Sequence, residues 1–295
     1  MRVPCSTSNL GAGFDCIGLA LDRWLDARYI PDDQPLRMER AGTLRPLTHS
    51  PDDDLLVRAF RAGLAARGVR HATGAITAKS DIPIARGLGS SGAATVAGLA
   101  LAAVATGNAL DRAAELDRAL ALEGHPDNAA PALFGGLVAI ARSNDAHAAR
   151  AIQLPLATSL GFAFAAPETV VTTAAARAAL PADVPHGVAA RGLGRVAALL
   201  RGLETGDPDL LAIGFEDELH VPYRLPLIPR AREAMAAARA AGALAVTISG
   251  SGSGLIAVAA PEQTERIAQA MSAAFSDGVA LALMADHAGV VALNE

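Results

Sequence analysis

A glycine-rich segment at residues 83–94 carries the clearest chemical signal in the chain. It reads Pro-Ile-Ala-Arg-Gly-Leu-Gly-Ser-Ser-Gly-Ala-Ala. Gly87, Gly89 and Gly92 allow the backbone to turn tightly and to approach a ligand closely, and the two serines begin a segment with a helical pattern. The first amides of a helix have no internal partners and lie at the positive end of its dipole, so they bind anions. The segment therefore predicts a phosphate-binding loop.

The residues in and before this segment argue against two other kinds of nucleotide-binding loop. A Walker A loop requires Gly-Lys-Ser/Thr, and the segment has no lysine. The three glycines match the dinucleotide-binding spacing G-x-G-x-x-G, and Asp111 follows about twenty residues later. That fold needs an apolar strand running into the first glycine, whereas Pro83 and Arg86 stand there. A purely structural Gly-Ser turn remains as an alternative.

Two further segments concentrate small polar and acidic side chains. Residues 3–15 read Val-Pro-Cys-Ser-Thr-Ser-Asn-Leu-Gly-Ala-Gly-Phe-Asp, which predicts a short strand leading into a polar loop. Residues 123–131 read Glu-Gly-His-Pro-Asp-Asn-Ala-Ala-Pro and follow a predicted helix. Mg²⁺ is typically bound by one or two carboxylates together with phosphate oxygens, so Glu123 with the Ser91 hydroxyl is a candidate metal site. Taken alone, either segment is also consistent with an ordinary turn or helix exit.

The elements that position these segments alternate between helix and strand, which indicates an α+β protein. Ala-rich segments with larger apolar residues at spacings of three and four predict helices over 91–106, 111–123, 188–202, 229–241 and 262–275. Short apolar runs predict strands over 74–79, 136–141, 160–166, 243–249, 254–260 and 279–284. From residue 160 onward the order is β-α-β-β-α-β with extra helices in the first crossover, as in a ferredoxin-like layer. The Gly-Ser-Gly-Ser-Gly run between the two middle strands predicts a hairpin.

Length and charge narrow the class of protein further. The 295 residues suggest two domains, and the interrupted apolar pattern near residue 150 predicts domains 1–150 and 151–295. The 25 basic and 30 acidic residues leave a net charge of −5, which disfavours nucleic acid as a partner.

The cysteines and the longest uncharged run bear on location. Cys5 and Cys16 lack the spacing of a zinc site and indicate a reducing compartment. The uncharged run 91–110 consists mostly of Ala, Gly, Ser and Thr, which predicts a buried helix rather than a membrane span. There is no export signal at the N-terminus, so we expect a cytoplasmic protein with no membrane partner.

Taken together, the motifs resemble the superfamily of small-molecule kinases that act on galactose, homoserine, mevalonate and phosphomevalonate. The N-terminal Pro-x-Ser-x-x-Asn-Leu-Gly-x-Gly-Phe-Asp, the central Pro-x-x-x-Gly-Leu-Gly-Ser-Ser and the C-terminal Ser-Gly-Ser-Gly-Ser-Gly match in order and separation. Within that superfamily, residues 9–15, 123–131 and 221–229 are similar to the homoserine kinase family. Two departures are Gly92, where the family usually has Ala, and a C-terminal motif without the proline that many members have.

The resemblance implies a two-domain α+β fold with a ferredoxin-like C-terminal domain and an active site in the cleft between the domains. It also implies transfer of the γ-phosphoryl group of ATP to the side-chain hydroxyl of L-homoserine, a step toward threonine, with Mg²⁺ as cofactor. A homodimer is the oligomeric state that it suggests. Another kinase of the superfamily and a non-catalytic ligand sensor are the alternatives. A sensor does not need to retain metal ligands such as Ser91 and Glu123.

Residue by residue, the resemblance assigns roles to positions in all three motifs. The loop around the ATP phosphates would comprise Pro83, Ile84, Ala85, Arg86, Gly87, Leu88, Gly89, Ser90, Ser91, Gly92 and Ala93. The Mg²⁺ ligands would be Ser91 and Glu123. The Gly250–Gly254 turn would lie beside this loop, although the hairpin alone accounts for its glycines.

The substrate would be held by charged groups at both of its ends. The resemblance places Asn9 and Asp15 at its ammonium group. It places Arg177 and Arg224 at its carboxylate, for which the arginine fork is suited. The residues around the attacking hydroxyl would be His125, Asp127 and Asn128. If Glu123 binds the metal, Asp127 is the acid left as a candidate base, although the family is thought able to work without one.

Overall fold

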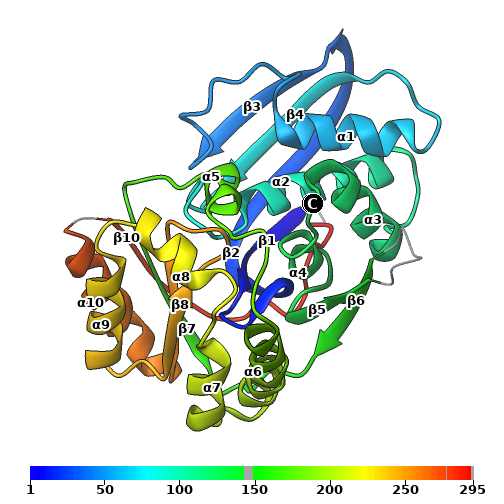
Figure 1. Ribbon diagram of the computed structural model, residues 1–295. Coiled ribbons are helices and arrows are strands. Elements are labelled where there is room, and N and C mark those ends of the chain that lie inside the picture. Colours follow the sequence, from blue (N-terminus) through cyan, green and yellow to red (C-terminus); the bar gives the residue numbers. More distant parts are fainter. Residues whose placement is uncertain (143–148, 277, 294–295) are drawn as a thin grey trace.

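Two β-sheets with helices packed against them form the α+β architecture of the chain (Figure 1). The computed structural model describes residues 1–142, 149–276 and 278–293. The first sheet takes strands up to Leu154, and the second begins at Gly161. The change of sheet therefore falls at residues 155–160, a few residues beyond the predicted domain boundary at 150.

The first sheet is organised around one long strand. Its strands are β1 (Arg2–Asn9), β2 (Gly13–Pro35), β3 (Arg37–Gly42), β4 (Thr73–Ser80), β5 (Leu137–Ala141) and β6 (Arg150–Leu154). The 23-residue β2 pairs with β1 along one edge and with β4 and β5 along the other. Strand β3 pairs with β4 in parallel, and α1 lies in the crossover between them.

The helices of this half pack around α2. They are α1 (Leu55–Ala65), α2 (Ser90–Ala105), α3 (Arg112–Glu123) and α4 (Ala129–Phe134). As predicted, α2 is buried along most of its length and contacts β1, β2, α1 and α3 (Figure 1). The Asp111 carboxylate accepts hydrogen bonds from the amides of Ala113 and Ala114 and caps α3. Because Asp111 is a helix cap, the dinucleotide-binding interpretation lacks its acidic residue.

The second sheet has the strand order of a ferredoxin-like layer, which confirms the prediction. Its strands are β7 (Gly161–Pro167), β8 (Ala245–Ile248), β9 (Leu255–Ala259) and β10 (Gly278–Leu283). They are arranged β10-β7-β9-β8 with every pair antiparallel. Helices α9 (Ala231–Ala240) and α10 (Thr264–Phe275) pack on this sheet.

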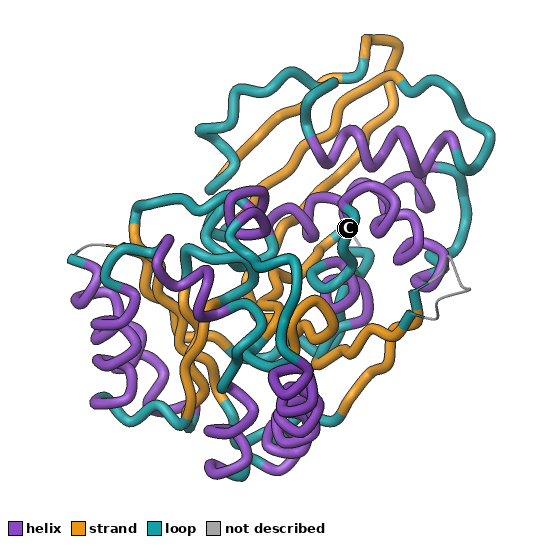
Figure 2. The backbone as a smooth tube through the Cα atoms, viewed as in Figure 1, coloured by secondary structure: helices purple, strands orange, loops and turns teal. Residues whose placement is uncertain are grey.

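The first crossover of the second half contains the predicted additional helices. These are α5 (Thr173–Ala178), α6 (His186–Thr205), α7 (Pro208–Phe215) and α8 (Val221–Arg224), and a short 3₁₀ turn at Leu225–Leu227 follows α8. A second 3₁₀ turn, at Pro261–Gln263, lies outside this crossover, between β9 and α10. Figure 2 shows α6 and α7 lying at one end of the molecule, away from α1, β3 and β4. Within the described ranges, no helix combines the length and apolar character that crossing a bilayer requires.

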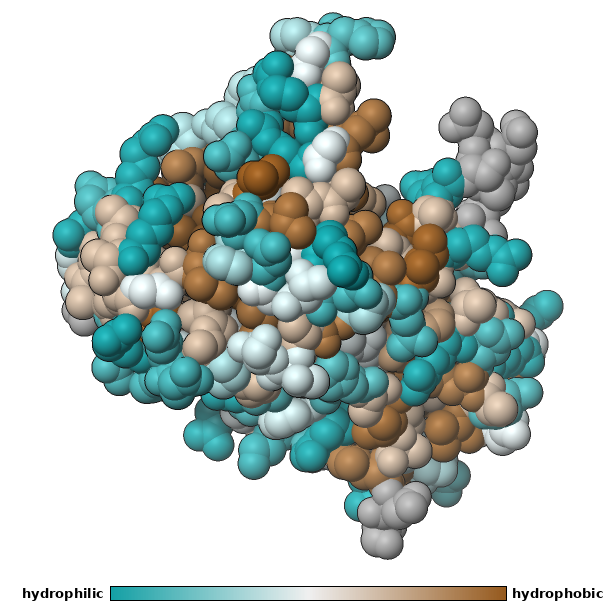
Figure 3. All heavy atoms as spheres, turned by 90° about the horizontal axis from the view of Figure 1, so that it is seen from below, coloured by the Kyte–Doolittle hydropathy of each residue, from teal (hydrophilic) through white to brown (hydrophobic). Residues whose placement is uncertain are grey.

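The two halves share one hydrophobic core. Apolar side chains of the first sheet and α2 belong to the same buried cluster as Phe162, Phe164 and Ile256 of the second sheet. The tail after β10 returns to the first sheet, where Leu21 bridges Ala285 and residue 2 bridges residue 291 (Figure 1). A second buried cluster lies between the second sheet and α9 and α10. On the face in Figure 3, hydrophilic side chains are interspersed with hydrophobic ones, as on ordinary protein surfaces.

Some elements depart from the sequence pattern. Strand β1 spans eight residues and continues through Asn9, so it is longer than predicted and includes the polar residues expected in a loop. These side chains are buried between the two halves, where they find hydrogen-bond partners that a local pattern does not reveal. Residues 31–35 hold two prolines and two aspartates, typical of a turn, yet β2 continues through them.

The close contact of α1 and α2 generates a stability prediction. A Cβ atom on Gly98 would lie 2.3 Å from the Leu56 carbonyl oxygen and 2.7 Å from the Phe60 nitrogen, so the helices would have to separate. We expect Gly98→Ala to lower the free energy of unfolding by about 1–3 kcal/mol. The control is Gly194→Ala on exposed α6, where a Cβ meets nothing within 4 Å, and which should add about 0.5–1 kcal/mol. Urea unfolding measures both, and a stable Gly98→Ala variant would contradict this packing.

Candidate active site

A cavity of about 450 Å³ lies where the three motifs meet. It is lined by parts of the glycine loop, the 125–128 segment, the β1–β2 loop, the start of α5 and the Gly250–Gly252 turn. Segments more than 200 residues apart in the sequence thus face one another across a single cavity. The predicted juxtaposition of the motifs is what the fold produces.

The glycine loop ends in a left-handed turn that begins α2. Gly89 is the N-cap residue with φ 59° and ψ 31°, and a Cβ there would lie 2.2 Å from the Ser6 Oγ. Gly87 has φ 91°, and a Cβ there would lie 2.3 Å from the Ser249 carbonyl oxygen. No side chain in the described residues caps this helix, so the amides of its first turn are left for a ligand at the cavity, which Ser90 and Ser91 line.

The predicted phosphate-loop residues divide into two groups. Those that line the cavity are Ile84, Ala85, Gly87, Gly89, Ser90 and Ser91. Those that do not line it are Pro83, Arg86, Leu88, Gly92 and Ala93. Leu88 and Ala93 are buried core residues, and Gly92 lies against the Asn128 backbone. Leu88, Gly92 and Ala93 therefore pack against the body of the protein, while the other members of the loop face the cavity or flank it.

Residues of the β8–β9 hairpin donate hydrogen bonds to backbone carbonyls of the glycine loop. The Ser249 hydroxyl donates to the Gly87 carbonyl at 2.6 Å, and the Gly254 amide donates to the Arg86 carbonyl at 3.0 Å. Because Ser249 already donates its proton to Gly87, the Thr7 hydroxyl must donate to Ser249 at 2.8 Å. The hairpin thus steadies the phosphate loop through buried hydrogen bonds.

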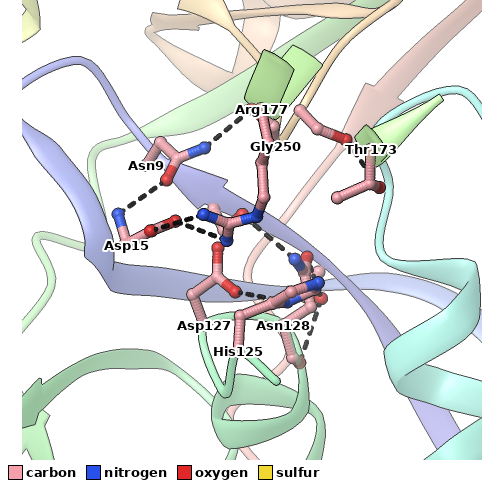
Figure 4. A network of polar contacts seen from close by, with 11 residues as sticks. Asn9, Asp15, His125, Asp127, Asn128, Thr173, Arg177 and Gly250 are labelled. Carbon is pink, nitrogen blue, oxygen red and sulfur yellow. Dashed lines mark hydrogen bonds and ion pairs between the residues drawn. The ribbon is translucent and has the colours of Figure 1, made fainter. Parts of the chain in front are cut away.

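Asn9 ends β1 and Asp15 lies near the start of β2, beside this hairpin. The Asn9 amide donates to the Gly250 carbonyl at 2.7 Å, and its oxygen accepts from the Asp15 backbone amide at 2.9 Å. Arg177 on α5 forms a two-pronged ion pair with the Asp15 carboxylate at 3.0 and 3.1 Å (Figure 4). Both side chains of this pair are about 40% exposed. From the sequence we expected Asp15 and Arg177 at opposite ends of a substrate, whereas in the structure they contact each other.

The 125–128 segment forms a second polar group. The His125 Nδ1 lies 3.1 Å from the Asp127 Oδ1, and the Asn128 amide donates to the Ser8 hydroxyl at 3.1 Å (Figure 4). The Asp127 hydrogen bond raises the pKa of His125. Burial opposes ionisation of Asp127, but His125 and the Ser8 hydroxyl outweigh it and lower the pKa of Asp127. At pH values between the lowered pKa of Asp127 and the raised pKa of His125, the pair is therefore an imidazolium and a carboxylate.

Glu123 ends α3 behind this segment, outside the cavity lining. Burial raises the pKa of its carboxyl, while nearby groups, first the Thr95 hydroxyl and then His125 and the Ser91 hydroxyl, act in the opposite direction. Its Oε1 is buried and has no hydrogen-bond partner among the described residues. A buried carboxylate oxygen without a partner, near a serine hydroxyl, has the hard oxygen donors that suit Mg²⁺.

Arg224 is the most deeply buried cation at the cavity, with 2% of its surface exposed. Its Nε donates to the Ala176 carbonyl at 3.2 Å, and its guanidinium lies 4.9 Å above the Phe14 ring. Burial lowers its pKa, but arginine starts so high that it stays charged. None of the ion pairs in the described part of the chain includes Arg224. A buried guanidinium that faces a cavity without a counter-ion is suited to bind an anion.

The far end of the cavity was not predicted from the sequence. Its apolar side chains come from β3, α1 and the segments around them, namely Met38, Leu44, Leu47, Leu55 and Leu56. Thr173 and Ser251, whose hydroxyls are 3.3 Å apart, also line the cavity. Scattered leucines carry no motif, so only the folded chain identifies this end.

Comparisons with known proteins agree with this geometry. The models of the GHMP kinases N terminal domain and the GHMP kinases C terminal match residues 54–136 and 198–277. The homoserine kinase of Moorella thermoacetica is 41% identical over 94% of this chain and 92% of its own length. A homoserine kinase of Thermus thermophilus is 40% identical over 92% of this chain and 91% of its own length.

The chain belongs to the homoserine kinase family of GHMP kinases. A crystal structure of homoserine kinase from Cytophaga hutchinsonii superposes with a TM-score of 0.86 at 28% identity, covering 98% of this chain and 95% of that one. The L. major mevalonate kinase shares the fold, with a TM-score of 0.75 at 15% identity over 97% and 96% of the two chains. The predicted family and two-domain kinase fold are confirmed.

The His125–Asp127 pair predicts a pH-dependent contribution to stability in this family member. A raised histidine pKa stabilises the fold fully below about pH 6.5 and loses its effect as pH rises through the folded value. The lowered pKa of Asp127 stabilises it above about pH 4 and is lost as pH falls through the folded value.

We expect His125→Gln to lower the free energy of unfolding by about 1–2 kcal/mol at pH 5.5 and by about 0.5 kcal/mol at pH 9. Urea titrations at both pH values measure the difference. His186→Gln at the exposed start of α6 is the control and should show no such trend. A loss that grows with pH would contradict the pairing.

Proposed function

We propose that this chain transfers the γ-phosphoryl group of ATP to the side-chain hydroxyl of L-homoserine and forms O-phospho-L-homoserine, in threonine biosynthesis. The observation that carries the proposal is the buried Arg224, near Asp15, in a cavity that the uncapped start of α2 also lines. An amino acid needs a cation for its carboxylate and an anion for its ammonium group. A phosphate donor needs free backbone amides in the same cavity, and the start of α2 provides them.

The triphosphate of ATP is proposed to lie on the amides between Gly87 and Ser91. Helix amides and the dipole of α2 provide positive potential at fixed positions. The adenine base is assigned to the far end of the cavity, where Met38, Leu44 and Leu55 offer an apolar surface for the face of a flat aromatic ring. This division places the γ-phosphoryl group nearest to the 125–128 segment.

Ser91 and Glu123 would hold Mg²⁺ when it is bound. The unpartnered Glu123 Oε1 and the Ser91 hydroxyl that acts on its pKa support this assignment. A magnesium ion neutralises charge on the phosphates and orients them. With Glu123 as a metal ligand, its carboxylate is not available as a base.

The two ends of the substrate are proposed to be held by charges from both halves of the chain. Asp15 accepts a hydrogen bond from the ammonium group. The side-chain oxygen of Asn9 keeps Asp15 in place by accepting from the Asp15 backbone amide. Arg224 and Arg177 bind the carboxylate. The Ala176 carbonyl contacts Arg224, so these two arginines are held as neighbours. In this arrangement the ammonium group of the zwitterion pairs with Asp15, and its carboxylate pairs with Arg177 and with the buried Arg224. Each of these charges then has a partner.

His125, Asp127 and Asn128 are proposed to surround and orient the attacking hydroxyl. Asp127 is a weak base because its pKa is lowered and one of its oxygens is taken by His125. Phosphoryl transfer through a loose transition state depends chiefly on alignment and charge neutralisation. We therefore assign Asp127 to orienting the hydroxyl rather than to removing its proton.

Location and assembly are proposed on separate grounds. The two cysteines of the described chain are both free thiols, which is compatible with a cytoplasmic enzyme. The family suggests a homodimer. Light scattering and cell fractionation test these two points.

Substrate choice tests the proposed function directly. We expect ATP turnover with L-homoserine, and no turnover above background with mevalonate, galactose or no acceptor, because those acceptors lack an ammonium group for Asp15. A coupled assay for ADP measures all four conditions. Turnover that does not depend on homoserine, or its absence, would overturn the proposal.

The proposed roles of the two acids predict unequal losses. Glu123→Ala should lower kcat about a thousandfold because the metal loses a ligand, which is several kcal/mol of transition-state stabilisation. Asp127→Asn should lower it about tenfold, below the 10²–10⁴ that a general base contributes. Steady-state kinetics at saturating substrates measures both. Glu204→Ala on the exposed face of α6 is the control, and equal losses at Glu123 and Asp127 would contradict these assignments.

A further inference from the structure

His220 lies behind the cavity, out of contact with the cavity space itself, and is completely buried. It immediately precedes the four-residue α8, and Arg224 is the last residue of that helix. The Arg224 amide donates to the His220 carbonyl at 3.0 Å, so one helical turn fixes both residues. Residues four apart on a helix lie on the same face, which brings their side chains together.

We propose that His220 is a positioning residue that fixes the Arg224 guanidinium relative to the β1–β2 turn and to Asp15 at the start of β2. The separation between the cation and the anion that bind the two ends of the substrate is then set by this contact. The inference rests on the proposed function, because it takes Arg224 and Asp15 as the substrate-binding charges.

The hydrogen bonds of His220 determine which ring nitrogen carries the proton. The His220 Nε2 lies 3.1 Å from the Gly11 carbonyl oxygen, which can only accept. The Nε2 must therefore hold the proton, and in a neutral ring the Nδ1 is left as an acceptor. The Arg224 Nη1 lies 3.5 Å from that Nδ1 and can only donate. One imidazole thus links the β1–β2 loop to the guanidinium.

The surroundings of His220 keep the ring neutral. Burial lowers the pKa of His220, and the positive charge of Arg224 acts in the same direction against the pull of Asp217. The Asp217 carboxylate lies 3.8 Å from the Nε2, but it already accepts from the amides of Leu219, His220 and Val221. A protonated ring would place a second cation beside Arg224 and would remove the acceptor that Arg224 uses.

Phe14 makes the link rigid. Its ring stacks on the His220 ring with centroids 4.8 Å apart and planes at 19°, and the Arg224 guanidinium lies over the same phenyl ring. Phe14 directly precedes Asp15 in the chain. The aromatic stack and the Gly11 hydrogen bond therefore both join the His220–Arg224 unit to the β1–β2 turn and to the start of β2, where Asp15 lies.

Three substitutions at His220 separate the two hydrogen bonds. His220→Leu removes both, so the buried Arg224 loses an acceptor and can shift. His220→Asn keeps an oxygen near the Nδ1 position that can accept from Arg224. His220→Gln keeps a donor near the Nε2 position for Gly11. The exposed His186→Asn on α6 is the matched control.

We expect His220→Leu to raise the KM for homoserine about tenfold or more, with kcat and the KM for ATP changed less than threefold. His220→Asn should recover most of that loss and His220→Gln should recover less, while His186→Asn should match the wild type. Calorimetric titration of homoserine should show the same order of affinities. In an Arg224→Lys background, His220→Leu should raise the KM little further, because the effect acts through the guanidinium.

The outcomes divide the hypotheses. If kcat falls in all His220 variants with the KM for homoserine unchanged, His220 has only a structural role and the inference is wrong. Equal KM values for wild type and His220→Asn, Gln and Leu also overturn it. If His220→Leu does not fold, the Asn and Gln variants still decide the question by their relative KM values. A wild-type protein that does not act on homoserine at all would instead overturn the proposed function.

Discussion

The polar end of β1 is the constraint on which the site depends. Residues 6–9 are buried where the two sheets meet, and buried hydroxyl and amide groups are costly unless each finds a partner. Their partners come from different loops, with Asn128 on one side and Ser249 and Gly250 on the other. Satisfying one strand therefore positions the 125–128 segment and the β8–β9 hairpin, and the hairpin in turn holds the glycine loop at the same cavity.

The charges around that cavity follow a complementary rule. Arg224 is buried without a carboxylate partner, whereas Asp15 and Arg177 are partly exposed and pair with each other. The fold thus keeps one cation fixed and leaves one ion pair open to solvent. Such an arrangement suits a small molecule that carries both charges, because its binding satisfies the buried cation and exchanges one ion pair for two.

Much of the framework could be predicted from the sequence because it depends on local chemistry. Glycines at fixed offsets predict the turn before α2, and alternating apolar segments predict the ferredoxin-like sheet. Contacts between distant segments could not be predicted in this way. The Asp15–Arg177 ion pair, the apolar end of the cavity and the role of His220 all depend on long-range packing that leaves no periodic signal. The polar side chains of residues 6–9 predicted a loop. They lie in a strand instead, because their burial brings them hydrogen-bond partners that only the folded chain reveals.

A crystal structure with a non-hydrolysable ATP analogue, Mg²⁺ and L-homoserine would show where each end of the two substrates binds. We predict the triphosphate within hydrogen-bond distance of the amides at the start of α2. We predict the amino acid with its carboxylate on Arg224 and its ammonium group on Asp15. A nucleotide bound elsewhere, or an amino acid held with its ends reversed, would contradict the account.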